Sequence, residues 1–314
     1  MISISVHICT FNPREEHLRR TINALKTQTL ARDKWEFLLV NNASTTEVAQ
    51  KADLTWHPNA RYLVETKIGK TNALIHAIRS AQAELLVTVD DDNVLAPNYL
   101  ERCLEIASQF PMLGAWGGQI IPEFETQPPQ WVIPHLHNLA LYESDHDVWT
   151  NLPRAEYFPP GAGMCFRALV GRHYSALVAK DPMRAGLDRR GEIMIGCGDT
   201  DLACCSVDLG FGTGRFTALK LTHLIPKERI TPAAILDLIE RTAYSFTIFH
   251  HIRPETLPAE PLYPTSYLKK RNYNKLEKLQ NALMPKEIRR VREAALRGLQ
   301  KASIELRKRE IPKK

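Results

Sequence analysis

Three adjacent aspartates and an asparagine, Asp90-Asp91-Asp92-Asn93, come directly after the apolar run Glu84–Val89. Adjacent carboxylates repel one another by about 1 kcal/mol per close pair even in water, so a cation should offset that cost. Ligands bind at the carboxyl ends of strands in open α/β sheets, and carboxylates there suit Mg²⁺ or Mn²⁺, which in turn hold a diphosphate. The alternative is a solvated acidic turn, or Asp92 capping the next helix. The buried strand before the cluster favours the metal and diphosphate interpretation.

Polar residues also follow the first two apolar runs of the chain. Thr10-Phe11-Asn12 comes after Ser3–Cys9, and Asn41-Asn42-Ala43-Ser44 comes after Phe37–Val40. Asn and Ser favour turns in any protein, which explains each cluster if it is taken singly. If the apolar runs are strands of one parallel sheet, however, all three polar clusters lie at the same edge. The set therefore predicts a ligand site there.

Two further segments carry groups suited to acid–base or metal chemistry. Residues 196–202, with the sequence GCGDTDL, lead into a helix, so Asp199 or Asp201 is either a helix N-cap or a general base that faces a pocket. His223 follows the apolar run Phe216–Thr222, and a single histidine is usually structural. Near a carboxylate site it becomes a candidate metal ligand, with Lys227 and Arg229 as candidate phosphate contacts.

Composition and missing motifs exclude several classes of protein. The chain has 314 residues, 44% hydrophobic and 24% charged, which is typical of a soluble globular protein and not of a disordered chain or a disulfide scaffold. No apolar stretch approaches 18 residues, and the first residues lack a secretory signal, so neither a membrane span nor export is expected. The six cysteines form no CxxC, which indicates a reduced, cytoplasmic protein. HExxH, Walker A, GxSxG and dinucleotide-binding motifs are all missing.

The elements that position these residues alternate along the first half of the chain. Apolar runs alternate with segments of helical spacing, which predicts a largely parallel sheet with helices on both faces. The predicted strands are Ser3–Cys9, Phe37–Val40, Tyr62–Val64 and Glu84–Val89, and the predicted helices are Glu15–Thr27, Gly69–Ala81 and Pro97–Phe110.

The second half is less regular. Its predicted strands are Gly117–Ile121, Met164–Arg167 and Phe216–Thr222, and its predicted helices are Ala168–Lys180, Asp199–Leu209, Pro232–His251, Tyr273–Met284 and Lys286–Arg309. Pro122–Pro160 is predicted to form long loops with short helices, and Asp181–Gly198 to form a loop. Arg253–Pro264 contains four prolines and is the best candidate for a linker.

Charge is distributed unevenly. The chain has 41 Lys and Arg residues and 35 Asp and Glu residues. Thr265–Lys314 contains 16 of the basic residues and 5 of the acidic ones, which leaves 25 basic and 30 acidic residues in residues 1–264. The helix predicted over Lys286–Arg309 has an apolar stripe flanked by basic residues. Such a helix binds an anionic membrane surface, or its stripe packs on the body of the protein or on a second copy in a homo-oligomer. Nucleic-acid binding would rest on this tail alone and is not expected.

Taken in order, these motifs resemble those of glycosyltransferase family 2, whose members have the nucleotide-diphospho-sugar transferase (GT-A) fold. The resemblance covers about Ile2 to Arg229. It rests on Thr10-Phe11-Asn12, Asn41-Asn42-Ala43-Ser44, Gly69-Lys70-Thr71-Asn72-Ala73, Asp90-Asp91-Asp92, Pro160-Gly161-Ala162-Gly163-Met164 and Gly198-Asp199-Thr200-Asp201-Leu202. Gly198 stands where the family often has Glu. Asn42 stands where it often has an Asp that contacts the base, which leaves the nucleobase open.

The resemblance implies an α/β catalytic domain over residues 1–230, with a nucleotide-binding half of about 1–115 and an acceptor half of about 116–230. Residues 231–264 then form a helix and a proline-rich linker, and residues 265–314 form a basic helical extension. The implied enzyme is cytoplasmic, or peripheral on the inner face of the membrane. It works in bacterial surface-polysaccharide or glycolipid biosynthesis.

The implied reaction moves a sugar from a nucleotide-diphosphate sugar to a hydroxyl of a carbohydrate or lipid-linked acceptor, with inversion. Asp92 and His223 would hold Mg²⁺ or Mn²⁺, and Asp199, rather than Asp201, would be the general base. The expected nucleotide-sugar contacts are Thr10, Asn12, Asn42, Lys70, Asp90 and Asp91, and the expected donor-sugar or acceptor region contains Trp116, Gly117, Gly118, Gly161 and Asp201.

Two other functions are compatible with these residues. A nucleotidyltransferase of similar fold needs a basic, glycine-rich signature near the first strand, where residues 10–16 contain only Arg14 as a basic side chain. A non-catalytic nucleotide-sugar-binding protein would keep the fold, and changing Asp199 would then abolish no activity.

Overall fold

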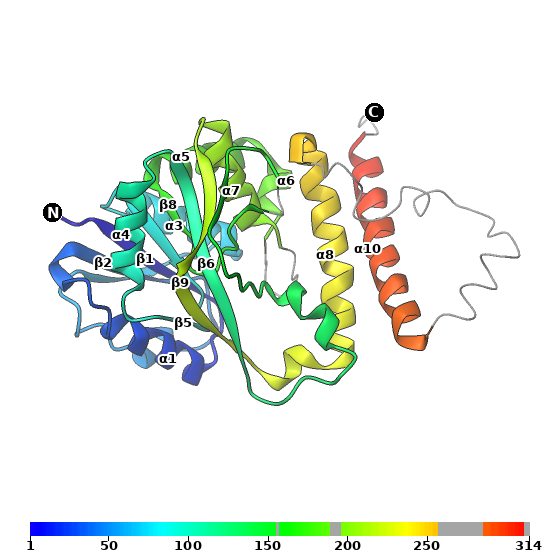
Figure 1. The fold of residues 1–314 in the computed structure, drawn as a ribbon, viewed down its shortest axis with the longest axis horizontal. Helices are drawn as coiled ribbons and strands as arrows, with labels where there is room; N and C mark the ends of the chain where they lie inside the picture. Colours follow the sequence, from blue (N-terminus) through cyan, green and yellow to red (C-terminus); the bar gives the residue numbers. More distant parts are fainter. Residues whose placement is uncertain (155–156, 189–195, 257–284, 311–314) are drawn as a thin grey trace, which may run out of the picture.

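The computed structural model describes residues 1–154, 157–188, 196–256 and 285–310. These residues form one nine-stranded sheet with helices on both faces (Figure 1). The strand order is β3-β2-β1-β4-β8-β6-β9-β5, and β7 pairs with β9. Among the described residues, no helix combines the length and the apolar character needed to cross a membrane.

The first four strands confirm the predicted parallel arrangement. They are β1 (Ile4–Thr10), β2 (Trp35–Asn41), β3 (Ala60–Val64) and β4 (Leu85–Val89), and all the pairings among these four strands are parallel. Every residue of β2 and β4 is buried. A strand covered on both faces has no solvent side to require polar residues, which explains the continuous apolar runs.

Helices cover both faces of these strands. On one face, α1 (Glu15–Lys26) and α4 (Tyr99–Gln109) pack on Val6, Phe37 and Val87. On the other face, α3 (Lys70–Ser80), α5 (Ala168–Lys180) and α7 (Gly198–Asp208) share a core with Leu86. The helix predicted from Pro97 begins at Tyr99 instead, so the proline precedes the helix.

The second half of the sheet is mixed rather than parallel. The long strands β6 (Leu113–Phe124) and β9 (Gly212–Ile225) run parallel to each other. Between β4 and β6 lies β8 (Cys165–Arg167), antiparallel to both, and β5 (Asn93–Leu95) and β7 (Val148–Thr150) pair antiparallel with β9. The smaller helices are α2 (Val48–Lys51), α6 (Pro182–Ala185), η1 (Arg32–Lys34), η2 (Ile133–Leu139), η4 (Lys227–Ile230) and η5 (Pro254–Thr256).

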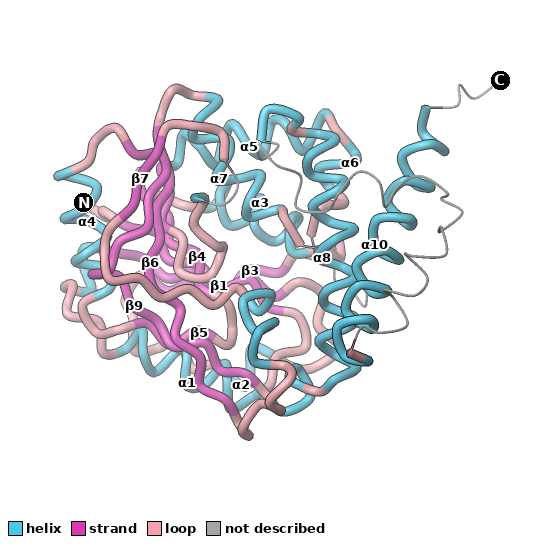
Figure 2. Tube along the Cα trace, turned by 45° about the vertical axis from the view of Figure 1, so that its right-hand side comes forward, coloured by secondary structure: helices cyan, strands magenta, loops and turns pink. Residues whose placement is uncertain are grey.

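Two long helices lie side by side beyond the sheet (Figure 1, Figure 2). The first, α8 (Pro232–Ile252), begins as predicted, because the Thr231 hydroxyl accepts a hydrogen bond from the backbone N–H of Ala234 at 3.2 Å. The second, α10 (Lys286–Glu310), follows α8 along its length. Its apolar stripe packs on α8, where Ala295 and Leu299 share a core with Ile239. The stripe is therefore packed on the protein itself, whereas the helix predicted over 273–284 lies outside the described residues.

Candidate active site

Each of the three adjacent aspartates has a different partner at the carboxyl edge of the sheet. Lys70 Nζ lies 2.7 Å from Asp90 Oδ1, and the Thr10 hydroxyl donates to Asp91. Asp92 Oδ2 lies 3.4 Å from His223 Nε2 and 3.5 Å from Arg229 Nη1. Lys70 and Arg229 both lie within ion-pair distance and offset part of the carboxylate repulsion.

The turn after β4 places these side chains through Asn93. Its Oδ1 accepts from the backbone N–H of Asp90 at 3.2 Å, and its Nδ2 donates to Asp92 Oδ1 at 3.0 Å. Asn93 also opens β5 and pairs in register with His223 on β9. A strand pairing therefore brings Asp92 beside His223, although 130 residues separate them in the chain. Asn is a frequent turn residue, and that was the only local signal for this role.

Asp92 and His223 suit a divalent cation. Arg229 Nη1 lies 3.2 Å from His223 Nε2. Because a guanidinium can only donate, a hydrogen bond between these two groups has the Nε2 lone pair of His223 as its acceptor. A carboxylate oxygen and an imidazole lone pair are donors that Mn²⁺ accepts. Mg²⁺ and Mn²⁺ sites of this kind take further oxygen ligands from phosphate and water.

The two asparagines expected near the base bind backbone groups of the surrounding loops. Asn12, in the left-handed region at φ 50°, accepts from the N–H of Thr45 at 2.8 Å, and its own N–H donates to Ser44 Oγ at 2.9 Å. Asn42 is buried; its Oδ1 accepts from the N–H of Gly69 at 2.8 Å. Asn42 thus fixes the residue that precedes Lys70, the first residue of α3.

Asp199 lies in the first turn of α7 and faces the glycine segment before β8. Its Oδ2 accepts from the N–H of Gly161 at 2.7 Å, and its Oδ1 accepts from the N–H of Thr200 at 2.8 Å. A Cβ at Gly161 would lie 2.8 Å from the Asp199 carboxylate, so only glycine permits this approach.

The same glycine segment connects Asp199 with the aspartate cluster. Gly161 O accepts from the N–H of Met164 at 3.2 Å, and Met164 O accepts from the N–H of Thr88 at 2.9 Å. Thr88 lies two residues before Asp90 on β4. Asp199 and the aspartates are therefore held at one edge by a short chain of backbone hydrogen bonds.

The structure separates Asp201 from this edge. Asp201 is fully buried, and its Oδ1 accepts from Arg184 at 2.5 Å and from Arg253 at 2.8 Å. It was expected in the donor-sugar or acceptor region, but both charges that it meets belong to the protein. No local pattern in the sequence indicates these partners.

The expected contact between Trp116 and the sugar needs correction. Trp116 is a residue of β6, and its side chain has no exposed surface because it packs in the core that the sheet shares with α1 and α4. A solvent-borne ligand cannot reach it. Gly117 and Gly118 follow it on β6, where both residues pair with β9 and the register shifts after Gly118. These two glycines are therefore paired residues within the sheet.

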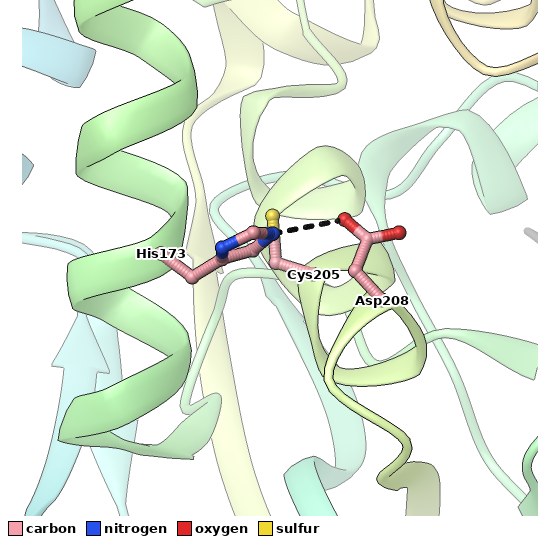
Figure 3. Close-up of side chains that lie close together, drawn as sticks. All are labelled: His173, Cys205 and Asp208. Carbon is pink, nitrogen blue, oxygen red and sulfur yellow. Dashed lines mark ion pairs between the residues drawn. The ribbon is translucent and has the colours of Figure 1, made fainter.

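A second group of potential metal ligands lies away from this edge, where His173 of α5 faces Cys205 and Asp208 of α7 (Figure 3). Arg253 already supplies positive charge there, since it donates to Asp208 Oδ1 at 2.7 Å and to Cys205 Sγ at 3.3 Å. Burial also raises the pKa of the Cys205 thiol, which opposes the thiolate that a metal requires. We interpret this group as an ion-paired structural cluster.

Comparison with known proteins identifies relatives of the chain. A family model described as glycosyl transferase family 2 matches residues 5–171. A curated N-acetylglucosaminyltransferase from Bradyrhizobium diazoefficiens (strain JCM 10833 / BCRC 13528 / IAM 13628 / NBRC 14792 / USDA 110) is 24% identical over 166 residues, which are 52% of this chain and 32% of that protein. The chain thus spans about a third of the length of this relative.

Solved structures share the fold. S. aureus TarS 1-349 in complex with UDP-GlcNAc aligns with 99% of this chain and 93% of its own, at a TM-score of 0.53 and 12% identity. The mannosyltransferase PcManGT from Pyrobaculum calidifontis, in complex with GDP-Man and Mn²⁺, aligns with 96% of this chain and 75% of its own, at a TM-score of 0.53 and 17% identity. At these identities the likeness shows the fold alone, and it confirms the predicted fold class.

Proposed function

Because the chain belongs to glycosyl transferase family 2, we propose that it moves a sugar from a nucleotide-diphosphate sugar to an acceptor hydroxyl, with inversion. The observation that carries this proposal is the shared sheet edge at which Asp90, Asp91 and Asp92 meet Lys70, Thr10 and His223. Asp199 is tied to the same edge through Gly161. One edge thus combines groups for a diphosphate with a candidate base.

The charged groups at this edge of the sheet include a base, two cations and a pair of candidate metal ligands. Asp199 accepts the proton of the acceptor hydroxyl during attack, a contribution of typically 10²–10⁴-fold. Lys70 and Arg229 stabilise the negative charge that develops on the departing nucleoside diphosphate. Asp92 and His223 would hold Mg²⁺ or Mn²⁺, which when bound adds electrostatic stabilisation of that leaving group.

The relatives suggest which donors to test first. The curated relative is named an N-acetylglucosaminyltransferase, and one structural neighbour binds UDP-GlcNAc. Another neighbour binds GDP-Man with Mn²⁺. We therefore propose UDP-GlcNAc as the first donor, GDP-Man as the comparison donor, and Mn²⁺ as the first metal.

The proposal also names the class of acceptor. A carbohydrate or lipid-linked hydroxyl in surface-polysaccharide or glycolipid synthesis fits a cytoplasmic enzyme that contacts the inner membrane surface. The exposed basic residues of α10 support contact with anionic lipid through charge. Its apolar stripe packs on α8 and does not contribute to that contact.

Titration calorimetry of the full chain with UDP-GlcNAc and GDP-Man, with Mn²⁺ or with EDTA, tests the proposal. We expect one donor to bind in Mn²⁺ and to bind weakly in EDTA, and we expect Asp92→Asn to lose the Mn²⁺ dependence. Asp33→Asn is the matched control, because this exposed aspartate precedes β2 and so lies at the opposite edge of the sheet. Failure of a panel of nucleotide sugars to bind, or equal donor affinity in EDTA, would contradict the proposal.

A further inference from the structure

The arginine that follows α8 binds along one face of α7. Asp201, Cys205 and Asp208 are spaced by four and three residues, so they share that face. Arg253 Nε donates to Asp201 Oδ1 at 2.8 Å, Nη1 donates to Asp208 Oδ1 at 2.7 Å, and Nη2 donates to Cys205 Sγ at 3.3 Å. One buried guanidinium thus contacts two successive turns of the helix.

A second arginine binds the same aspartate from the other side. Arg184 of α6 donates to Asp201 Oδ1 at 2.5 Å, and its side chain is only 11% exposed. Arg253 is itself fixed by the turn after α8, because its carbonyl accepts from the N–H of Thr256 at 3.0 Å and from the Thr256 hydroxyl at 2.7 Å. Asp201 is therefore held between α6 and the end of α8.

The position of Asp201 determines where Asp199 points. At 3.6 residues per turn, two residues are separated by about 200° around the helix axis. When Asp201 faces Arg253, Asp199 must face the other side of α7, where it accepts the Gly161 N–H at 2.7 Å. A rotation of α7 about its axis would move both carboxylates together.

We propose that Arg253 is a positioning residue that holds α7 in the rotation at which the general base Asp199 meets the acceptor. This inference rests on the proposed function. Arg253 lies outside residues 5–171, the span matched by the family model. The C-terminal helix α8 is then part of the catalytic unit, not an appendage to it.

The guanidinium is suited to this task. Burial is the largest single influence and works against the charge, but the nearby negative groups and the hydrogen bonds to Asp201 and Asp208 together outweigh it and raise the pKa of Arg253, so the side chain stays charged at every working pH. Its planar set of donors matches carboxylates on two turns, whereas lysine offers a single point charge. Arg253→Lys should therefore keep the charge and lose the fixed rotation.

Steady-state transfer kinetics of the full chain test this role. We expect Arg253→Lys to lower kcat about 10²-fold, as a displacement of about 1 Å does, with donor affinity unchanged. In an Asp199→Asn background the same change should lower the residual rate no further, because Arg253 acts through Asp199. The control is Arg241→Lys, on the same helix, whose ion pair with Asp237 lies within α8.

Hydrogen exchange separates this inference from the proposed function. The Gly161 amide is protected by Asp199, so Arg253→Lys should speed its exchange and leave the amides of β1 unchanged. This readout holds even if no donor is transferred, in which case only the proposed function fails. Unchanged exchange at Gly161, or an equal loss of rate with and without Asp199, would overturn the positioning role.

If Arg253→Lys does not fold, Asp208→Asn replaces it. The Asp208 side chain is 27% exposed, and the change removes the negative charge that Arg253 Nη1 meets there while Asp201 keeps its charge. We expect kcat to fall and exchange at the Gly161 amide to speed up, each by less than in Arg253→Lys. A folded Asp208→Asn variant with unchanged kcat and unchanged Gly161 exchange would also reject the proposal.

Discussion

Two aspartates separated by one residue illustrate how environment decides a role. Asp199 and Asp201 are equivalent in a linear reading of residues 198–202, since both lie in the first turn of a helix. In the fold, Asp199 is partly exposed and binds two backbone N–H groups, whereas Asp201 is fully buried between two arginines. The two residues should therefore fail in different ways.

Asp199→Asn should reduce turnover by about 10²–10⁴-fold and leave donor binding near normal, because asparagine keeps one acceptor oxygen but takes no proton. Asp201→Asn should instead lower the free energy of unfolding by about 3–5 kcal/mol, because it leaves buried cations without their charged partner. Single-turnover transfer and urea unfolding measure the two effects. An active Asp199→Asn beside a stable but inactive Asp201→Asn would reverse the assignment.

His7 makes stability depend on pH. The ring is fully buried in β1, and burial, followed by the charge of Lys70, lowers its pKa from 6.5 to about 3. The unfolded chain therefore takes up the His7 proton near pH 6.5 while the folded chain resists it. By linkage, the free energy of unfolding falls as pH drops from 6.5 towards 3.

Urea unfolding at several pH values should show that the free energy of unfolding falls less towards acid pH in His7→Gln than in the parent, because glutamine does not titrate. The matched control is His251→Gln at an exposed position of α8, which should keep the parent slope because an exposed ring is not desolvated by folding. An unchanged slope in His7→Gln would show that other groups cause the acid sensitivity.

At the scale of elements, α8 and α10 approach each other closely at Gly298. A Cβ there would overlap the carbonyl oxygen of Glu240 and lie 3.0 Å from the Cβ of Ala243. In an isolated helix, Gly→Ala stabilises by about 1 kcal/mol. In this protein the overlap should dominate, and overpacking typically costs 1–3 kcal/mol.

Gly298→Ala should therefore lower the melting temperature despite its better helix propensity. Gln300→Ala, on the exposed side of the same helix, should leave the melting temperature near the parent value or raise it slightly. Thermal unfolding followed by circular dichroism measures both variants. A Gly298→Ala variant that melts higher than the parent would show that the two helices are not packed this closely.

Sequence pattern predicts correctly those elements that depend on residues close together in the chain. Ala168–Lys180 was predicted with both ends correct, and the parallel order of the first strands followed from alternating strand and helix signals. It failed for β6 and β9, which extend beyond the predicted 117–121 and 216–222 at both ends. Their ends contain glycine, proline and charged residues that resemble turns, and pairing with strands distant in the sequence keeps these ends extended.

The candidate site was predictable where a motif names its residues and not where a distant partner decides. The pairing of Asp92 with His223 and the location of Asp199 in the first turn of α7 agree with the sequence interpretation. The sequence pattern predicts a linker that starts at Arg253, because four prolines follow it within residues 253–264. Its partner Asp201 lies 52 residues away, and no local spacing connects them.

At the scale of the whole molecule, the basic tail and the acidic body meet between α8 and α10. Arg297 Nε and Lys301 Nζ lie 2.7 and 2.5 Å from the carboxylate of Glu240. Together with the packed apolar stripe, these ion pairs make α10 part of the fold. A chain ending at Pro264 would uncover the apolar face of α8, which contradicts the picture of a detachable membrane anchor.

The packing of α10 determines what kind of membrane contact remains. The exposed basic residues that are not bound to Glu240 lie near both ends of the helix: Lys286, Arg289, Arg290, Arg307 and Lys308. Each contributes about 1 kcal/mol near an anionic surface. Most of the stripe is covered by α8, and Ile288, beside Arg289, is the stripe residue that stays more than half exposed, so charge supplies most of the expected binding. We expect the full chain to co-sediment with phosphatidylserine vesicles at low salt and to be released at about 1 M salt, where the Debye length is about 3 Å.

Charge reversal at Arg289 and Arg290 should weaken this sedimentation, whereas Arg102→Glu, on exposed α4 surface, should not. Strong binding that survives high salt would require apolar contact with lipid beyond the exposed Ile288, and hence separation of α10 from α8. Gly298→Ala distinguishes that case, because loosening the helix pair would then strengthen salt-resistant binding. If the helix pair stays closed on vesicles, the variant and the parent should be released at the same salt concentration.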